Sequence, residues 1–270
     1  MLKIGFLGSG KMAQALAKGF IASGLTRAEN LIASSPPQDS KLLEEFQSLG
    51  GKITNDNTEV TRQADILILA VKPFAVTPVL ESIKNSFSNS HLLMSIAMGI
   101  KIEALEKCLP GKPRILRAMP NTPAAFGVGA SVICGGSYAT PQDVDLAEKL
   151  MSAVGICRTA PETSFDAITA LSGSGPAYVF TIIEALSDGG VKMGLPRDLA
   201  TQLAIQTTLG AATMAKLSDD HLAVLREAVT SPAGSTAAGL HVLEKGGVRG
   251  WIASAVEAAT ERCILVSSKK

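Results

Sequence analysis

The chain opens with a short apolar run that two glycines interrupt at once, and this start limits the possible folds more than any other feature. Residues 1–7 precede Gly8-Ser9-Gly10, and an amphipathic stretch follows over residues 14–23 and stops at Gly24. The pattern predicts a strand, a tight turn and a helix, the unit that binds dinucleotides. Gly8 permits the turn, and Gly10 lets backbone approach a pyrophosphate lying on free N–H groups at the helix start. Glycine turns also close ordinary strand–helix units, but the position of this one favours a nucleotide.

Strand and helix patterns alternate through the first part of the chain. Strands are expected at 30–35, 52–54, 65–71, 91–97, 114–119 and 129–134, and helices at 41–49, 58–63, 74–86 and 141–154. The run 65–71 is unbroken and apolar, as in a strand buried in a parallel sheet. The fold class is therefore α/β, with a doubly wound, Rossmann-type sheet covered by helices on both faces.

Beyond about residue 160, strand-like runs give way to helical segments rich in alanine, threonine and glycine. Helices are expected at 176–186, 197–217, 220–229, 235–245 and 250–267. Several carry small residues on more than one face, which indicates burial on most sides. A second copy of the chain is the natural partner, although a compact monomeric bundle would give the same pattern. We therefore expect a dinucleotide-binding domain over residues 1–160 and an all-α dimerisation and substrate-binding domain over 161–270.

Composition excludes several classes of protein. The chain has 270 residues and a net charge of +1 without long basic runs, so nothing indicates nucleic-acid binding. Apolar runs are strand-sized, and the first begins at Leu2, so we expect no membrane span, no leader and a cytoplasmic protein. The four cysteines and three histidines are scattered. They are expected to be free thiols of a reducing compartment and isolated imidazoles, with no metal site.

The expected second strand lacks the acidic residue that binds the ribose hydroxyls in NAD-specific sites. It ends with Ser34 and Ser35, and the next carboxylate is Asp39. Two hydroxyls without an acid leave room for a 2′-phosphate, which favours NADP(H) over NAD(H), although an ordinary serine–proline turn has the same sequence. The nearest cations are Arg27 and Lys41.

Loops after two further strands belong to the same crevice, because ligands of such sheets lie at the carboxyl ends of the strands. They are residues 70–73 and 119–123. Prolines at 73, 120 and 123 stiffen them. Each loop alone could be a plain turn; together they favour a site.

Two segments of the helical part differ from ordinary connectors. Residues 171–178 read Leu-Ser-Gly-Ser-Gly-Pro-Ala-Tyr, for which a capped helix start accounts well. Residues 229–239 place hydroxyls and free amides between two helices around Pro232. Such a turn can hold a carboxylate without arginine, and it favours a small-anion site over a plain capped turn.

With these residues the chain resembles pyrroline-5-carboxylate reductases over essentially its whole length. The matching pieces are Gly8–Ala13, Ala-Val-Lys-Pro at 70–73, Met-Pro-Asn-Thr-Pro at 119–123, the 171–178 segment and the region 225–244. The last is the most specific. Ala233 and Ser235 vary positions that are often glycine or alanine in the family.

The resemblance implies reduction of 1-pyrroline-5-carboxylate to L-proline with NADPH, NADH being possible, by a homodimer or a ring of dimers. The cofactor-binding residues it implies are Gly8, Gly10, Lys11 and Met12 at the pyrophosphate, Ser34 and Asn57 near the adenosine, and Ala70, Val71, Lys72, Pro73, Ala97 and Asn121 toward the nicotinamide. The substrate-binding residues it implies are Ser231, Gly234, Ser235 and Thr236, with Thr236 as the catalytic candidate.

The implied hydride transfer depends more on the orientation of the substrate than on a strong side-chain acid, because a protonated cyclic imine is already electrophilic. The Thr236 hydroxyl is a weak acid, so water or a solvent-protonated iminium is the alternative. Two other functions are open. A β-hydroxyacid dehydrogenase would need a lysine such as Lys192, and a non-catalytic NADP(H) sensor would need no anion site at Ser231–Thr236.

Overall fold

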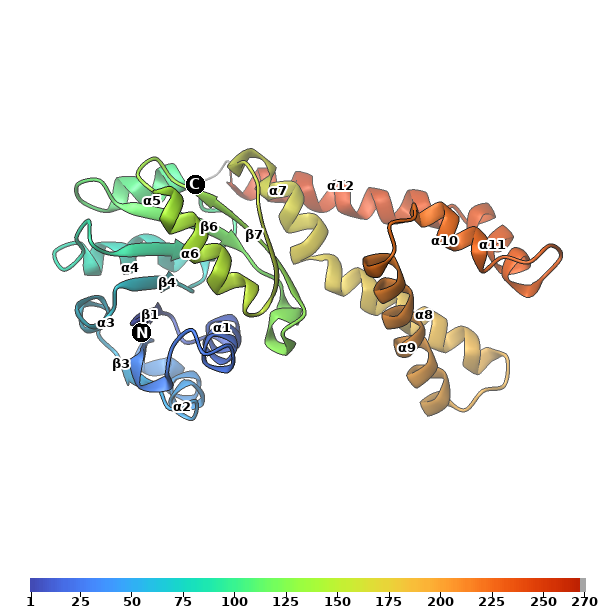
Figure 1. The fold of residues 1–270 in the computed structure, drawn as a ribbon, viewed down its shortest axis with the longest axis horizontal. Coiled ribbons are helices and arrows are strands. Elements are labelled where there is room, and N and C mark those ends of the chain that lie inside the picture. The colour runs from blue at the N-terminus through green and yellow to red at the C-terminus, as the bar shows by residue number, and fades with distance from the viewer. Residues whose placement is uncertain (268–270) are drawn as a thin grey trace. The chain divides into compact units, whose positions relative to one another are not determined.

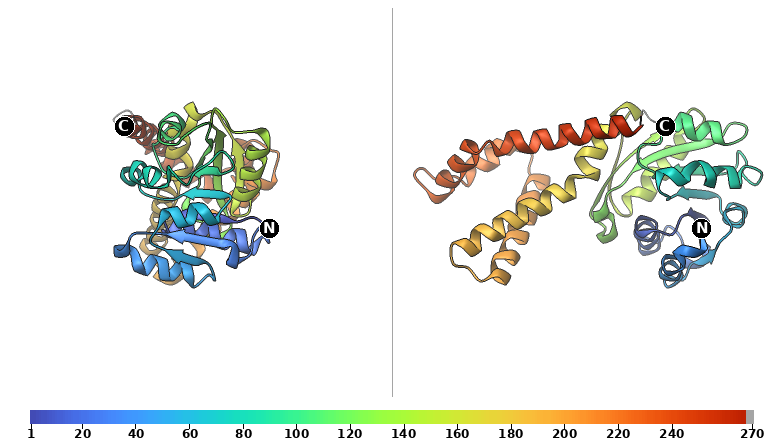
Figure 2. Two further views of the ribbon diagram at one scale, coloured as in Figure 1. Left: turned by 90° about the vertical axis from the view of Figure 1, so that its left-hand side faces the viewer. Right: turned by 180° about the vertical axis from the view of Figure 1, so that it is seen from behind.

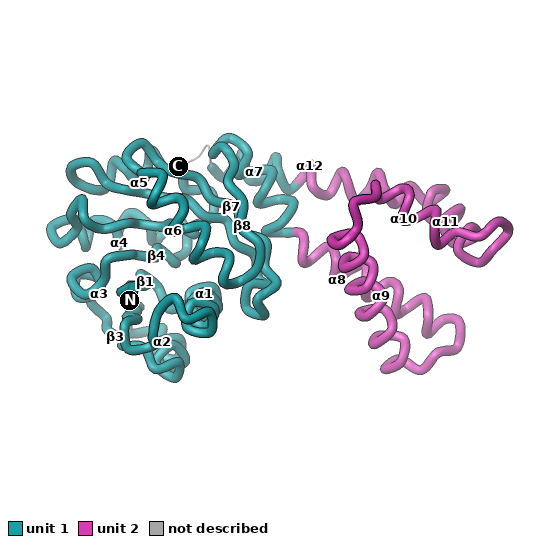
Figure 3. Tube along the Cα trace, viewed as in Figure 1, with its two compact units in different colours: residues 1–174, 259–270 teal, residues 175–258 magenta. Residues whose placement is uncertain are grey.

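The computed structural model describes residues 1–267. These form two compact units, coloured separately in Figure 3. The first contains residues 1–174 and 259–267, and the second contains Gly175–Ala258. The expected domain division after residue 160 is therefore not where the compact units part. They part 14 residues later, and the end of the last helix returns to the first unit.

The first unit is built on one eight-stranded sheet (Figure 1). Its order is β3-β2-β1-β4-β5-β6-β7-β8, and all neighbours are parallel except β6 and β7. The strands are β1 (Ile4–Leu7), β2 (Leu31–Ser34), β3 (Lys52–Thr54), β4 (Ile66–Leu69), β5 (Leu92–Ser95), β6 (Arg114–Met119), β7 (Gly129–Gly135) and β8 (Gly155–Thr159). The chain reverses its winding direction at β1, which pairs with both β2 and β4, so the expected Rossmann-type topology is confirmed.

Helices cover both faces of this sheet, as the two views of Figure 2 show. They are α1 (Lys11–Ala22), α2 (Ser40–Gln47), α3 (Asn57–Gln63), α4 (Val76–Ile83), α5 (Ile102–Cys108), α6 (Pro141–Ser152) and α7 (Phe165–Ile168). Short 3-10 turns occupy Ala28–Asn30, Pro37–Asp39, Pro73–Ala75, Thr122–Phe126 and Glu162–Ser164, and a π-helical segment occupies Thr169–Gly173.

Side chains alternate along β1 and give each face its own core. Ile4 and Phe6 pack in one apolar cluster with α1, α2 and α6, and Leu7 packs in the other with α3, α4 and α5. Both clusters are continuous across the central strands, which explains why these strands read as unbroken apolar runs.

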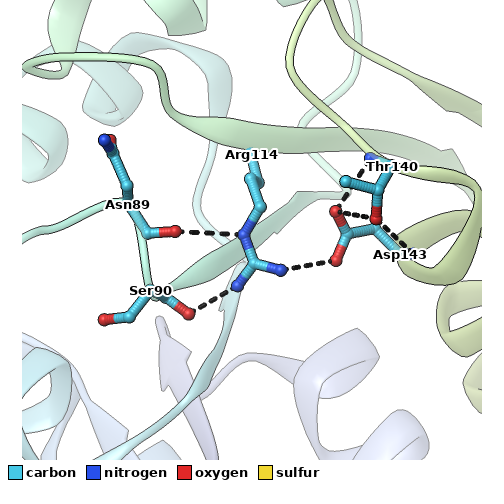
Figure 4. Close-up of polar contacts among 5 residues, drawn as sticks. All are labelled: Asn89, Ser90, Arg114, Thr140 and Asp143. Carbon is cyan, nitrogen blue, oxygen red and sulfur yellow. Dashed lines mark hydrogen bonds and ion pairs between the residues drawn. The ribbon is translucent and has the colours of Figure 1, made fainter.

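The start of β6 is fixed by a polar network (Figure 4). Arg114 donates to the carbonyl oxygens of Asn89 and Ser90 and forms an ion pair with Asp143, Nη1 to Oδ1 2.8 Å. Asp143 and Thr140 also form a reciprocal capping box at the start of α6. The buried carboxylate of Asp143 therefore accepts hydrogen bonds both from the start of α6 and from Arg114 on β6.

The second unit is all-helical. Its elements are α8 (Gly175–Lys192), α9 (Arg197–Leu217), α10 (Leu222–Ala228), α11 (Ser235–Lys245) and the first part of α12 (Val248–Ser267). A hydrogen-bonded set between α8 and α9 joins Ser187 to Thr201 (2.9 Å) and Arg197 to Ser187 and Asp188.

These helices do not build a core of their own. Within 175–258 the buried residues are Ser187, Ala200 and Ala204, while large side chains such as Phe180 and Trp251 are exposed (65% and 75%). The alternative of a compact monomeric bundle is therefore wrong, because a bundle would bury these side chains within one chain.

The sequence-based prediction missed four elements, namely β8, α5, α7 and the π-helical segment. Strand β8 buries only Cys157, so it has no apolar run to detect. Helix α5 has seven residues and buries only Ile102 and Leu105, and the sequence reading did not detect it. The π-helical segment lies where a simple helix start was expected. None of the helices within residues 1–267 is long and apolar enough to cross a membrane.

Candidate active site

Gly8 forms the turn between β1 and α1 in a conformation that requires glycine. Its φ is +105°, and a Cβ there would lie 2.5 Å from the carbonyl oxygen of Ala70. The Gly8 N–H donates to the Ser34 carbonyl (2.9 Å), and the Ala70 N–H donates to that of Leu7 (2.8 Å). The ends of β1, β2 and β4 are thus held together where the winding reverses.

Gly10 leaves open space at the start of α1. A Cβ built on it meets no atom within 4 Å, and as the N-cap it contributes no side-chain hydrogen bond. Among the described residues, Gln14 is the first of the helix whose N–H donates to a backbone partner, the Gly10 carbonyl. The amides of Lys11, Met12 and Ala13 therefore remain available, and the site fits a pyrophosphate.

Lys11 is joined to α2 beside this turn. Its Nζ lies 2.6 Å from Glu45 Oε2, which also accepts from Gln14 Nε2 at 3.1 Å. The hydrogen bond from Lys11, and after it that from Gln14, lowers the pKa of Glu45. Gln14 additionally donates to the Ser9 carbonyl (3.0 Å), so Lys11 lies on an ordered frame at the expected phosphate position.

The two serines at the end of β2 are both buried. Ser34 Oγ donates to Asn57 Oδ1 at 2.6 Å, and Ser35 Oγ accepts from the Ser9 N–H at 3.0 Å. The structure thus brings Ser34 and Asn57 together, but their side chains bond to each other. Sequence reasoning named Ser35 but missed Ser9, whose hydroxyl lies 2.7 Å from that of Ser35. Paired serines at the ends of β1 and β2 were the available signal.

The remaining cofactor candidates lie at the carboxyl ends of β4, β5 and β6. Ala70 and Val71 follow β4, Lys72 is exposed, and Pro73 begins a 3-10 turn. Ala97 follows β5 and is buried. Because these strands are parallel neighbours, their ends line one edge of the sheet.

Asn121 follows β6, but protein groups engage both ends of its side-chain amide. Its Oδ1 accepts from the Ala130 N–H at 2.8 Å, and its Nδ2 donates to the Ser172 carbonyl at 3.0 Å. Sequence reasoning placed it beside the cofactor and had no signal for either bond.

The expected substrate turn lies in the second unit, between α10 and α11. The Gly234 N–H donates to the Ser231 carbonyl at 3.0 Å, and Ala233 has φ +57°. Gly234 is the N-cap of α11 and makes no side-chain cap. The next backbone donor within the described part of the chain is Ala238, so the amides of Ser235 and Thr236 are open beside two exposed hydroxyls. This arrangement suits a carboxylate.

Comparison with known proteins agrees with both parts. The sequence model for pyrroline-5-carboxylate reductase dimerisation matches residues 162–264, and that for coenzyme F420-dependent NADP oxidoreductases matches residues 3–99. Pyrroline-5-carboxylate reductase of Arabidopsis thaliana is 45% identical over 96% of this chain and 94% of its own length. The chain belongs to the pyrroline-5-carboxylate reductase family.

Solved structures of the family superpose over nearly the whole chain. The reductase of Coxiella burnetii is 37% identical with a TM-score of 0.91, and 98% of each chain is covered. That of Plasmodium falciparum, solved with NADP bound, is 36% identical with a TM-score of 0.88 at the same coverage. The helical part is thus a dimerisation domain, in keeping with its exposed apolar side chains.

The dehydrogenase alternative has no support at Lys192. This lysine is the last residue of α8 and is exposed. Within residues 1–267 no cluster of histidine, cysteine and acidic side chains is arranged to hold a metal ion.

Proposed function

We propose that this protein reduces 1-pyrroline-5-carboxylate to L-proline with NADPH. The observation that carries the proposal is the 45% identity over nearly the full length of a reductase of that name. The glycine turn at Gly8 and Gly10 supplies the matching cofactor site, which a purely structural dimer would not need.

NADPH is the proposed cofactor, with NADH possible. The Plasmodium falciparum relative was solved with NADP. In this chain, residues 34–38 contain no carboxylate that would repel a 2′-phosphate. The amides of Lys11 and Met12 would hold the pyrophosphate, and Ala70, Lys72, Pro73 and Ala97 would border the cofactor toward its nicotinamide. When bound, the cofactor supplies the hydride for the imine carbon.

The turn from Ser231 to Thr236 is proposed to bind the substrate. Open amides at Ser235 and Thr236 and the positive end of α11 would anchor its carboxylate. This leaves the Thr236 hydroxyl free to donate a hydrogen bond to the ring nitrogen. Such a bond orients the imine and draws electron density from its C=N bond, while solvent supplies the proton that the nitrogen takes up as the amine forms.

Variants of Thr236 test this assignment. Removing the hydroxyl in Thr236→Ala should lower kcat/KM by about tenfold, since losing one orienting hydrogen bond costs about 1.4 kcal/mol. Thr236→Ser keeps the hydroxyl and should retain most of the activity. Unchanged kcat and KM in Thr236→Ala would remove Thr236 from the mechanism.

Assembly and location complete the proposal. The exposed side chains of α8–α12 are proposed to be covered by a second copy, with further association of dimers into a ring. Four free cysteines, of which Cys134 and Cys157 are buried, favour a reducing compartment such as the cytoplasm. Light scattering at several concentrations would give the size of the assembly.

A sensor is the competing function. It would bind NADPH without consuming it. Steady-state oxidation of NADPH and NADH by purified protein, with and without added 1-pyrroline-5-carboxylate, separates the two. Oxidation that depends on the imine supports the reductase, and binding without oxidation supports the sensor.

A further inference from the structure

Asn121 joins three segments of the first unit. It is 9% exposed. Its backbone carbonyl accepts from Ala124 within the 3-10 turn Thr122–Phe126, its Oδ1 accepts from Ala130 on β7, and its Nδ2 donates to Ser172 in the π-helical segment. A side-chain amide offers one acceptor and one donor group, and here protein holds both.

The carbonyl of Ser172 accepts a hydrogen bond from outside its own helix. In an α-helix, the carbonyl of residue 172 accepts from the N–H of residue 176. Residue 176 is proline, which has no N–H. Asn121 Nδ2, at 3.0 Å, supplies a hydrogen bond to this carbonyl. The π-type bond next to it, from the Ser174 N–H to the Thr169 carbonyl at 2.8 Å, shows how the helix is distorted at this point.

Packing beside the hydrogen bond is close enough that a side chain at residue 173 would displace the end of the Met119 side chain. A Cβ on Gly173 would lie 2.6 Å from Met119 Cε. Met119 is the last residue of β6, two positions before Asn121. The π-helical segment thus lies against the end of β6, and the Asn121 amide fixes it there.

The position of this contact connects it to the reaction. The end of β6 is the next one along the sheet edge from that of β5, where Ala97 lies. The 3-10 turn that Asn121 begins packs beside α1, the helix of the glycine turn. Asn121 therefore fixes one wall of the cofactor crevice without offering a free polar end to a ligand.

We propose that Asn121 is a positioning residue. Its amide replaces the hydrogen bond that Pro176 cannot make, and it thereby fixes the loop after β6 beside the nicotinamide end of the cofactor. This replaces the expectation that Asn121 contacts the cofactor, and its catalytic part rests on the proposed function.

A double-mutant cycle tests the proposal. Asn121→Asp keeps the acceptor for Ala130 but turns the donor into an oxygen facing the Ser172 carbonyl. It should lower kcat about tenfold and leave the NADPH dissociation constant within about twofold, because the crevice wall moves while the pyrophosphate site does not. Pro176→Ala restores an N–H at residue 176. By itself it should change kcat little, and combined with Asn121→Asp it should recover a large part of the loss.

Measurements without substrate separate this proposal from the proposed function. The melting temperature should fall in Asn121→Asp and recover in the double variant, and exchange of the Ser174 amide should follow the same pattern. Asn55→Asp is the matched control, since Asn55 Nδ2 also donates to a backbone carbonyl, that of Ser35, at 2.7 Å. Its effects should add to those of Pro176→Ala without coupling.

Two results would overturn the proposal. One is strict additivity of Asn121→Asp and Pro176→Ala in both stability and kcat. The other is a large loss of NADPH affinity in Asn121→Asp with unchanged kcat, which would make Asn121 a cofactor ligand. If no variant, nor the parent, oxidised NADPH with the imine, the proposed function would fail while the stability cycle still decided the hydrogen bond.

Discussion

The ion pair between Arg117 and Glu162 gives the sharpest stability prediction, because its two members differ in burial. The Arg117 side chain on β6 is 6% exposed and that of Glu162 is 30% exposed, with Nη1 and Oε1 3.0 Å apart. The guanidinium also lies 4.7 Å from the ring centroid of Phe165. Glu162 Oε1 accepts from the Ile102 N–H at 2.8 Å as well.

The cost of breaking the pair should depend on which charge remains. In Glu162→Gln the buried guanidinium loses its counter-charge, which costs about 3–4 kcal/mol. In Arg117→Met the remaining carboxylate keeps water and the Ile102 N–H, so the cost should be about 1–2 kcal/mol, including the lost contact with Phe165. The double variant should cost no more than Arg117→Met, giving a coupling energy of about 3 kcal/mol.

Thermal unfolding followed by far-UV circular dichroism measures these differences. At about 3 °C per kcal/mol, Glu162→Gln should lower Tm by about 10 °C and Arg117→Met by about 4 °C. The single tryptophan, Trp251, belongs to the second unit, so its fluorescence is a poor probe of this pair. Protein concentration must be equal throughout because association stabilises the fold. A larger loss in Arg117→Met than in Glu162→Gln would refute the reasoning.

Three further predictions concern buried polar groups. Ser131 Oγ is buried and has no hydrogen-bond partner in the described structure, so Ser131→Ala should leave Tm unchanged or raise it; a clear fall would reveal an unrecognised partner. Burial raises the pKa of Cys134 and of Cys157 from 9.0 to about 11. The stability that the neutral thiols contribute to the folded protein is therefore present below pH 9 and is lost as pH rises through 11. Replacing both with alanine should flatten the decline of Tm over that range, and an unchanged slope would contradict the assignment. Ser34→Asp should raise KM for NADPH far more than KM for NADH; equal increases would mean that the loss of its bond to Asn57, and not repulsion of a 2′-phosphate, causes the effect.

Most of the fold could be predicted because apolar periodicity and turn residues act locally. Helices α9 and α11 have the expected bounds, and β3 and β6 do as well. Strand β8 could not be found because it takes its place by pairing with β7, a contact that leaves no apolar run in its own sequence. The local sequence pattern therefore missed this edge strand, although the expected Rossmann-type order of the other strands is correct.

The candidate site was predictable where backbone geometry dictates the residue. Gly8 has a positive φ and no room for a Cβ, so the turn requires glycine there, and Gly10 leaves open space in which a ligand can approach the backbone. Side-chain partners depend on residues far apart in sequence and left no such signal. Ser34 bonds to Asn57, and Asn121 to Ser172, so their contacts became visible only in the folded chain.

Transfer of deuterium tests the central claim most directly. NADPH labelled with deuterium at C4 of the reduced nicotinamide, one face at a time, is incubated with the protein and 1-pyrroline-5-carboxylate, and the product is analysed by mass spectrometry. The account predicts L-proline carrying one deuterium at the former imine carbon from only one of the two labelled cofactors. Oxidised cofactor without labelled proline from either of the two labelled cofactors, or no oxidation at all, would contradict it.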